Sequence, residues 1–184
     1  MRLALVSDTH VPSRAAEIPD WVEAEIRAAD HTLHAGDFES QATLDRVNDL
    51  ADGDLTAVAG NADGPGLGLP EVATFEGGGA TFVAVHGTGS PSGYVDRVVR
   101  AVEDAAGDDG TESAAGGGDR GSVVGVCGHI HEHVDDVVDG VRLLNPGSAT
   151  GAEPASEATM LTAEVEDGTV DATLYREGEP VSSP

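Results

Sequence analysis

Near the start of the sequence stands Arg2-Leu-Ala-Leu-Val-Ser7-Asp8-Thr9-His10. Residues 2–7 form a short apolar run without glycine or proline, which is typical of a buried strand. The polar triplet that follows therefore lies at the carboxyl end of that strand. Open α/β sheets place their binding sites at such strand ends. Polar residues at the ends of other strands are thus candidates for the same site.

The next fifty residues alternate helix and strand. Apolar residues at helical spacing predict one helix that begins at Pro19 and Asp20 and a second over residues 41–50. Short apolar runs predict strands over 31–35 and 55–59. The two strands end in Gly36-Asp37 and in Gly60-Asn61-Ala62-Asp63.

The remainder of the chain is mainly β. A hairpin is predicted over 72–85 and ends in His86-Gly87, and a helix is predicted over 94–105. A strand over 122–127 ends in Gly128-His129-Ile130-His131. Two further hairpins turn at Asp-Gly pairs and cover 134–144 and 159–175. Such a chain can form two sheets packed face to face, with helices outside.

We expect one domain over residues 1–176, which includes a flexible loop at about 107–121, and a loose tail over 177–184. A chain of 184 residues suits one domain and is too short for two ordinary ones. The loop contains almost no apolar residues and is rich in glycine, aspartate, serine and alanine.

The charge restricts the partners. Nine basic residues, all arginine, face 34 acidic ones, so the net charge is −25. Such a surface repels nucleic-acid backbones and anionic membranes. Recurring apolar stretches argue against a disordered acidic chain, and we expect a folded protein from a salt-loving cytoplasm. No apolar run approaches 18 residues, no secretory signal is evident, and the one cysteine, Cys127, fits a reducing compartment.

Five predicted strand ends together supply seven nitrogen or oxygen ligands. Carboxylates combined with imidazoles suit Mn²⁺, Fe²⁺, Ni²⁺, Co²⁺ or Zn²⁺, whereas an all-oxygen site would not need histidine. Because residues i and i+2 of a strand point the same way, His129 and His131 are each expected to face one centre, as are Asp8 and His10. The seven candidate ligands are Asp8, His10, Asp37, Asn61, His86, His129 and His131.

Seven ligands are too many for one open metal and suit two. If Asp37 bridges them, each ion has four protein ligands and room for water. Two ions ~3.5–4 Å apart form the clamp used for in-line displacement at phosphorus, with a bridging hydroxide as the nucleophile. The two ions (+4) with Asp8 and Asp37 (−2) give a local charge of +2, which would attract an anionic substrate.

The same residues, in this order, resemble the calcineurin-like metallophosphoesterase superfamily and its small archaeal and bacterial phosphodiesterase branch. The resemblance covers roughly residues 1–175 and implies a four-layer α-β-β-α sandwich. It also implies Mn²⁺ or Ni²⁺ as the usual metals. The motifs that carry it are Asp8-Thr9-His10, Gly36-Asp37, Gly60-Asn61, His86-Gly87, Gly128-His129-Ile130-His131 and Asn145-Pro146-Gly147-Ser148.

By position, the resemblance implies two groups of ligands. Asp8, His10, Asp37 and His131 would hold the first metal. Asn61, His86 and His129 would hold the second, with Asp37 as the bridge.

Two positions depart from the family pattern. Ala62 stands where many relatives have a histidine that protonates the leaving group, so no general acid is evident and diesters with good leaving groups would suffer least. Asp63 would still orient its loop. Thr88 stands where relatives often carry another histidine.

We therefore predict a dimetal phosphodiesterase that acts on a small phosphoester substrate, with catalytic roles for Asp37, Asn61 and His131. A phosphomonoesterase or a cyclic-nucleotide phosphodiesterase would use the same site. A protein-interaction scaffold, like the retromer subunit related to this branch, is an alternative of another class, but it should have lost ligands. A homodimer through an apolar edge strand stays open. His34 is expected to be a packed histidine, and Arg97 a helix-surface residue.

Overall fold

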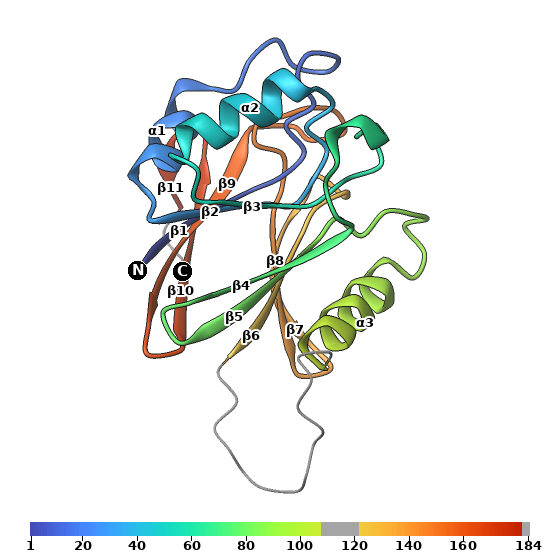
Figure 1. Ribbon diagram of the computed structural model, residues 1–184, viewed down its shortest axis with the longest axis vertical. Helices are drawn as coiled ribbons and strands as arrows, with labels where there is room; N and C mark the ends of the chain where they lie inside the picture. Colours follow the sequence, from blue (N-terminus) through green and yellow to red (C-terminus); the bar gives the residue numbers. More distant parts are fainter. Residues whose placement is uncertain (108–121, 182–184) are drawn as a thin grey trace, which may run out of the picture.

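The computed structural model describes residues 1–107 and 122–181. Two mixed sheets pack face to face (Figure 1). The first has the strand order β11-β10-β9-β1-β2-β3 and the second has the order β4-β5-β6-β8-β7. The first sheet consists of β1 (Arg2–Val6), β2 (His31–His34), β3 (Leu55–Ala57), β9 (Thr159–Glu166), β10 (Thr169–Arg176) and β11 (Glu179–Pro180). The second consists of β4 (Val72–Gly77), β5 (Ala80–Val85), β6 (Val123–Cys127), β7 (His133–Val138) and β8 (Val141–Pro146).

Three apolar clusters separate four layers. One lies between the sheets and includes Leu5, Phe82 and Leu161. A second joins the outer face of the first sheet to α1 (Asp20–Ala28) and α2 (Gln41–Leu50). The third joins the second sheet to α3 (Tyr94–Gly107). Figure 1 shows the helices on opposite outer faces. The predicted four-layer α-β-β-α sandwich is confirmed.

The parallel strands set the position of the site. In the first sheet β2 pairs in parallel with both β1 and β3, and in the second sheet β6 pairs in parallel with both β5 and β8. The carboxyl ends of β1, β2 and β3 therefore meet at one edge, as do those of β5 and β6. Antiparallel hairpins add the outer strands, because Asp139-Gly140 and Asp167-Gly168 adopt the left-handed conformations that tight turns require.

The C-terminal segment differs from expectation. The segment from Glu177 is not loose throughout, because β11 pairs with β10 and the Glu177 carboxylate accepts a hydrogen bond from the Ala158 amide at 2.7 Å. The expected flexible loop at 107–121 lies outside the described residues except for Gly107, which closes α3. The Gly64–Pro70 loop contains a short 3₁₀ helix, η1 (Pro65–Leu67). None of the helices in the described parts of the chain has the length and hydropathy that a bilayer crossing requires.

Candidate metal centre

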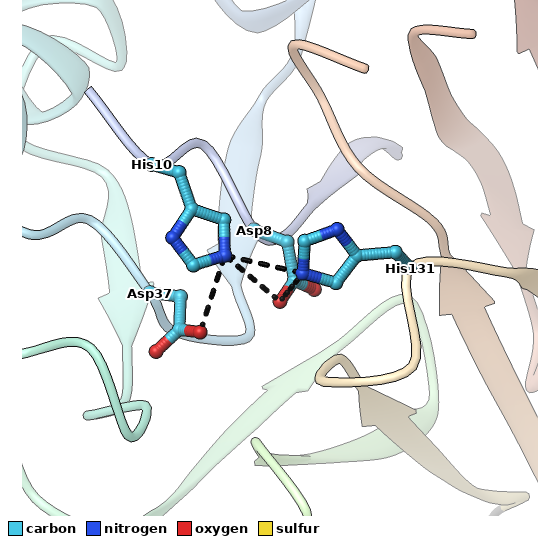
Figure 2. A group of neighbouring side chains, drawn as sticks. All are labelled: Asp8, His10, Asp37 and His131. Atoms are coloured by element: carbon cyan, nitrogen blue, oxygen red, sulfur yellow. Dashed lines mark hydrogen bonds and ion pairs between the residues drawn. The ribbon is translucent and has the colours of Figure 1, made fainter. Parts of the chain in front are cut away.

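Four buried side chains meet where β1, β2 and β6 end (Figure 2). Asp8, His10, Asp37 and His131 each offer one ligand atom, and these atoms all lie within 4.8 Å of one another. The Nε2 atom of His10 lies 3.1 Å from Nε2 of His131 and 3.3 Å from Oδ2 of Asp37. The Nε2 atom of His131 lies 3.2 Å from Oδ1 of Asp8. This set of two carboxylates and two imidazoles is suited to a borderline divalent metal.

Asp37 also faces a second group of candidate ligands. Its Oδ2 lies 3.4 Å from Nε2 of His86, and the same nitrogen lies 3.3 Å from Oδ1 of Asn61. The other carboxylate oxygen, Oδ1, accepts a hydrogen bond from the Ala62 amide at 2.7 Å. One oxygen of Asp37 thus lies between the His10 and His86 ring nitrogens.

His129 lies on the side of this second group. Its ring centroid is 5.2 Å from that of His86, whereas the His131 ring stacks against His10 at 5.0 Å. The two rings therefore lie beside different groups, and the strand rule, which placed His129 and His131 at one centre, does not describe this segment. The reason is that both residues have left-handed φ values, 75° and 57°, and not the extended backbone that the i and i+2 rule assumes. The Nε2–H of His129 donates to the Gly89 carbonyl at 2.8 Å, which leaves Nδ1 with the free lone pair.

Left-handed backbone is concentrated at the candidate ligands. Asp8, His10 and Asp37 have φ values of 52°, 48° and 63°, in addition to the two histidines after β6. Each such residue costs of order 1–3 kcal/mol and persists only where its surroundings fix it, often at functional sites.

Hydrogen bonds fix the orientation of three imidazoles. The Nδ1–H groups of His86 and His131 donate to backbone carbonyls, those of Ala35 and Ala152, both at 2.7 Å. The Nδ1–H of His10 donates to the Glu39 carboxylate at 2.8 Å. In each ring Nε2 is left with its lone pair toward the centre, which is the state a metal ligand requires.

Asp63 holds the backbone around Asp37. Its carboxylate accepts hydrogen bonds from the amides of Asp37 (2.9 Å), Glu39 (2.7 Å) and Gly60 (2.8 Å). This contact compensates the left-handed conformation of Asp37. It also joins the loop after β2 to the loop after β3, which agrees with the expected orienting role of Asp63.

The turn at 145–148 supports the centre from behind. The Ser148 hydroxyl donates to the Asp8 carbonyl at 2.8 Å and accepts from the Ala152 amide at 2.9 Å. The Asn145 amide donates to the Gly128 carbonyl at 2.9 Å. Two loops that carry candidate ligands are therefore joined through this turn, but the structure gives neither side chain a contact with a ligand atom.

Two glycines are required by close packing. A Cβ atom at Gly60 would collide with the Asp37 carboxylate, and one at Gly128 would lie 2.9 Å from Oδ2 of Asp8. Neither position accommodates a side chain without displacing a candidate ligand.

Charges within the centre compensate each other. Burial raises the pKa of Asp8, but the neighbouring imidazoles of His10 and His131 outweigh it and hold that pKa well below its ordinary value. Burial lowers the pKa of His86, but the neighbouring Asp37 carboxylate raises it above its ordinary value. The carboxylates are thus ionised and attract cations, either protons on the imidazoles or metal ions.

A cavity of about 580 Å³ adjoins the second group of ligands and is lined in part by Asn61, His86, Thr88 and Arg97. The guanidinium of Arg97 donates to the carbonyls of Gly87 and Ser90, at 3.2 and 2.8 Å. Arg97 is therefore not a plain surface residue of α3. It fixes the loop that follows His86.

The sequence alone did not identify Glu39 as a residue of the site. An acidic residue two positions after Asp37 has no distinguishing pattern, and its contact with His10 spans 29 positions. His34, in contrast, is packed as expected, with its ring stacked on Phe38 at a centroid distance of 3.6 Å.

The chain is similar to known proteins along nearly its whole length. It is 30% identical over 182 residues to a probable metallophosphoesterase of Methanothermobacter thermautotrophicus, which covers 98% of this chain and 95% of the relative. A Thermotoga maritima protein solved by NMR is 28% identical and superposes with a TM-score of 0.68, over 95% of this chain and 98% of that one. Vps29 of Entamoeba histolytica, in a crystal structure with Zn²⁺, is 22% identical with a TM-score of 0.73, over 98% and 96% of the two chains.

A family model agrees with the geometry. The calcineurin-like phosphoesterase superfamily domain matches residues 1–168, which include all seven candidate ligands. The buried Asp and His cluster lies within this match and fits a divalent metal. The chain belongs to the calcineurin-like phosphoesterase superfamily.

Proposed function

We propose that this protein is a phosphodiesterase that works with two divalent metal ions. The single observation that supports this best is the position of Asp37, whose Oδ2 lies 3.3 Å from the His10 ring nitrogen and 3.4 Å from that of His86. One carboxylate oxygen between two groups of neutral and anionic ligands is the arrangement that a dimetal centre needs. When bound, such ions polarise phosphoryl oxygens and lower the pKa of water to near neutrality.

The chain itself binds and orients. The Oδ1 atom of Asn61 faces His86, so the amide nitrogen of the same side chain is free to donate to a phosphoryl oxygen. The imidazoles present Nε2 toward the centre because Nδ1–H is bonded behind them. The cavity lined by Asn61, Thr88 and Arg97 would accept one ester group of the substrate.

Ala62 bears on the substrate class. Its side chain cannot donate a proton, so the leaving group must depart as a stable anion. We therefore favour small diesters with good leaving groups over monoesters of alcohols. The Thr88 and Arg97 side chains in the cavity carry no catalytic proton in this proposal.

The candidate ligands and the relatives both indicate which metal ions suit the site. Mixed carboxylate and imidazole ligands suit Mn²⁺ or Ni²⁺, and Fe²⁺, Co²⁺ and Zn²⁺ are also compatible. The solved complex of Vps29 with Zn²⁺ supports metal binding by this fold. The net charge of −25 supports a cytoplasmic role in a salt-loving cell.

The test compares wild-type protein with His131→Ala. Metal-stripped chains in high salt receive Mn²⁺ or Ni²⁺, and metal content and hydrolysis of a chromogenic phosphodiester are measured together. We expect two metals per wild-type chain, and a loss of activity of at least about 100-fold in the variant, because a buried ligand is missing.

His133→Ala is the matched control. His133 lies two residues from His131, is half-buried at the start of β7, and is outside the group of converging ligand atoms. The control should keep both metals and most of the activity. Wild-type protein that binds no metal, or equal loss in both variants, would contradict the proposal.

A further inference from the structure

Glu39 lies directly behind His10. Its Oε1 accepts the Nδ1–H of His10 at 2.8 Å, while Nε2 of the same ring faces Asp37 and His131. Both side chains are largely removed from solvent, with exposed fractions of 12% for Glu39 and 1% for His10. The interaction is therefore weakly screened, in contrast to an ion pair on the surface.

The Glu39 carboxylate is itself fixed. Oε1 also accepts from the Ser13 hydroxyl at 2.6 Å, and Oε2 accepts from the Ser13 amide at 3.0 Å. The Glu39 amide donates to Asp63 at 2.7 Å, which compensates a left-handed φ of 73°. Several contacts thus keep this carboxylate against the His10 ring, and a strained backbone is maintained to place it there.

His10 differs in this respect from the other imidazoles among the candidate ligands. His86 and His131 donate Nδ1–H to neutral carbonyls, those of Ala35 and Ala152. His10 donates to an anion. A carboxylate on the distal nitrogen makes an imidazole a stronger electron donor and fixes its tautomer, and loss of such a partner typically weakens metal binding.

The charges of the two ligand groups also favour cation binding at the first position. The first group contains Asp8 and shares Asp37, whereas the second has the neutral amide of Asn61 in addition to Asp37. Glu39 adds another negative charge next to the first group only. A divalent cation is therefore attracted more strongly to the first position than to the second.

We propose that Glu39 is a positioning residue that acts through His10 to make the first metal position the tighter one, so that the two positions fill in order. This inference rests on the dimetal centre of the proposed function. It extends that proposal in two respects: the first position fills before the second, and Glu39 sets this order.

The experiment uses Mn²⁺ alone, titrated into the metal-free full-length chain in 1 M KCl. At this ionic strength the screening length is about 3 Å, so distant surface charges contribute little. Calorimetry measures the two affinities, and electron paramagnetic resonance at one equivalent of Mn²⁺ separates single ions from spin-coupled pairs. Wild-type protein should bind in two resolved steps and show the signal of single ions.

Glu39→Gln should lower the affinity of the first step by about 10- to 100-fold. The second step should change by less than about threefold, so spin-coupled pairs should appear already at one equivalent. The matched control is Glu132→Gln, which removes the same charge from an exposed residue next to His131. It should leave both steps and the spectrum unchanged.

Ser13→Ala is a second, milder variant. It removes one hydrogen bond from the Glu39 carboxylate without removing the charge, and it should weaken the first step by a smaller factor. Thermal melting of each metal-free variant establishes that it folds. If Glu39→Gln does not fold, the test relies on Ser13→Ala alone.

Equal weakening of both steps, or an unchanged first step in the folded variants, would overturn the role of Glu39. Failure of the proposed function looks different. Wild-type protein that fills in two steps but hydrolyses no phosphodiester would refute the activity and leave the order of filling intact.

Discussion

At the scale of single residues, His34 shows how burial controls protonation. The ring is fully buried, accepts a hydrogen bond from the Gly36 amide at Nδ1, and stacks on Phe38. Burial lowers the pKa of His34 to about 3. The folded protein therefore keeps this imidazole neutral where the unfolded chain protonates it.

This difference predicts a pH dependence of stability. Between an unfolded pKa of about 6.5 and a folded pKa of about 3, the unfolded state binds one more proton at His34. The contribution of the neutral His34 ring to the free energy of unfolding is fully present above pH 6.5. It decreases as the pH falls, by up to about 1.4 kcal/mol per pH unit. Urea denaturation of metal-free protein from pH 7 to pH 5 measures the slope.

His34→Asn keeps an acceptor for the Gly36 amide and removes the titrating ring. In this variant the free energy of unfolding should change less with pH than in wild-type protein, by up to about 1.4 kcal/mol per pH unit. Nuclear magnetic resonance of the His34 ring gives an independent check, and a midpoint near pH 6.5 in the folded protein would refute the assignment.

At the scale of elements, α3 holds the loop after β5 in place through hydrogen bonds. Arg97 donates to the carbonyls of Gly87, Ser90 and Ser92, and between them Gly89 accepts the Nε2–H of His129. The helix thus fixes the loop, and the loop fixes the ring of a candidate ligand.

If the chain binds two metals as proposed, Arg97→Ala should therefore weaken metal binding at the second position by about tenfold while binding at the first is kept. The measurement is the ratio of bound metal to protein after equilibration at limiting free metal, by elemental analysis. Arg100→Ala, an exposed position on the same helix, is the control and should match wild-type protein. A wild-type ratio in Arg97→Ala would show that the loop keeps its shape without the guanidinium.

The elements were predictable because each carries a local signal. Gln41–Leu50 begins after the capping hydroxyl of Ser40, and the Asp-Gly turns fix two hairpins. The candidate ligands were predictable because they follow strands. The roles of Glu39 and Arg97 were not, since they depend on contacts between segments far apart or on backbone carbonyls. The different sides taken by His129 and His131 depend on left-handed backbone, which sequence periodicity does not describe.

At the scale of the whole molecule, charge repulsion opposes folding. With a net charge of −25, compact protein should gain stability when salt screens its carboxylates. We expect the melting temperature of metal-free protein to rise by about 5 °C or more between 0.1 M and 2 M KCl, or roughly 2 kcal/mol for a domain of this size.

Sodium chloride at equal ionic strength should act alike, because screening does not depend on the identity of the cation. Unchanged melting and activity in dilute buffer and in molar KCl would show that the acidic surface is not an adaptation to salt.

The candidate ligands are divided between the two sheets. Asp8, His10, Asp37 and Asn61 follow strands of the first sheet, and His86, His129 and His131 follow strands of the second. Elsewhere the inner faces of the sheets meet mainly through apolar packing, which has no preferred direction. Bound ions would therefore cross-link the two halves of the sandwich at one end, as a disulfide would, in addition to the hydrogen bonds that His86 and Ser148 make there.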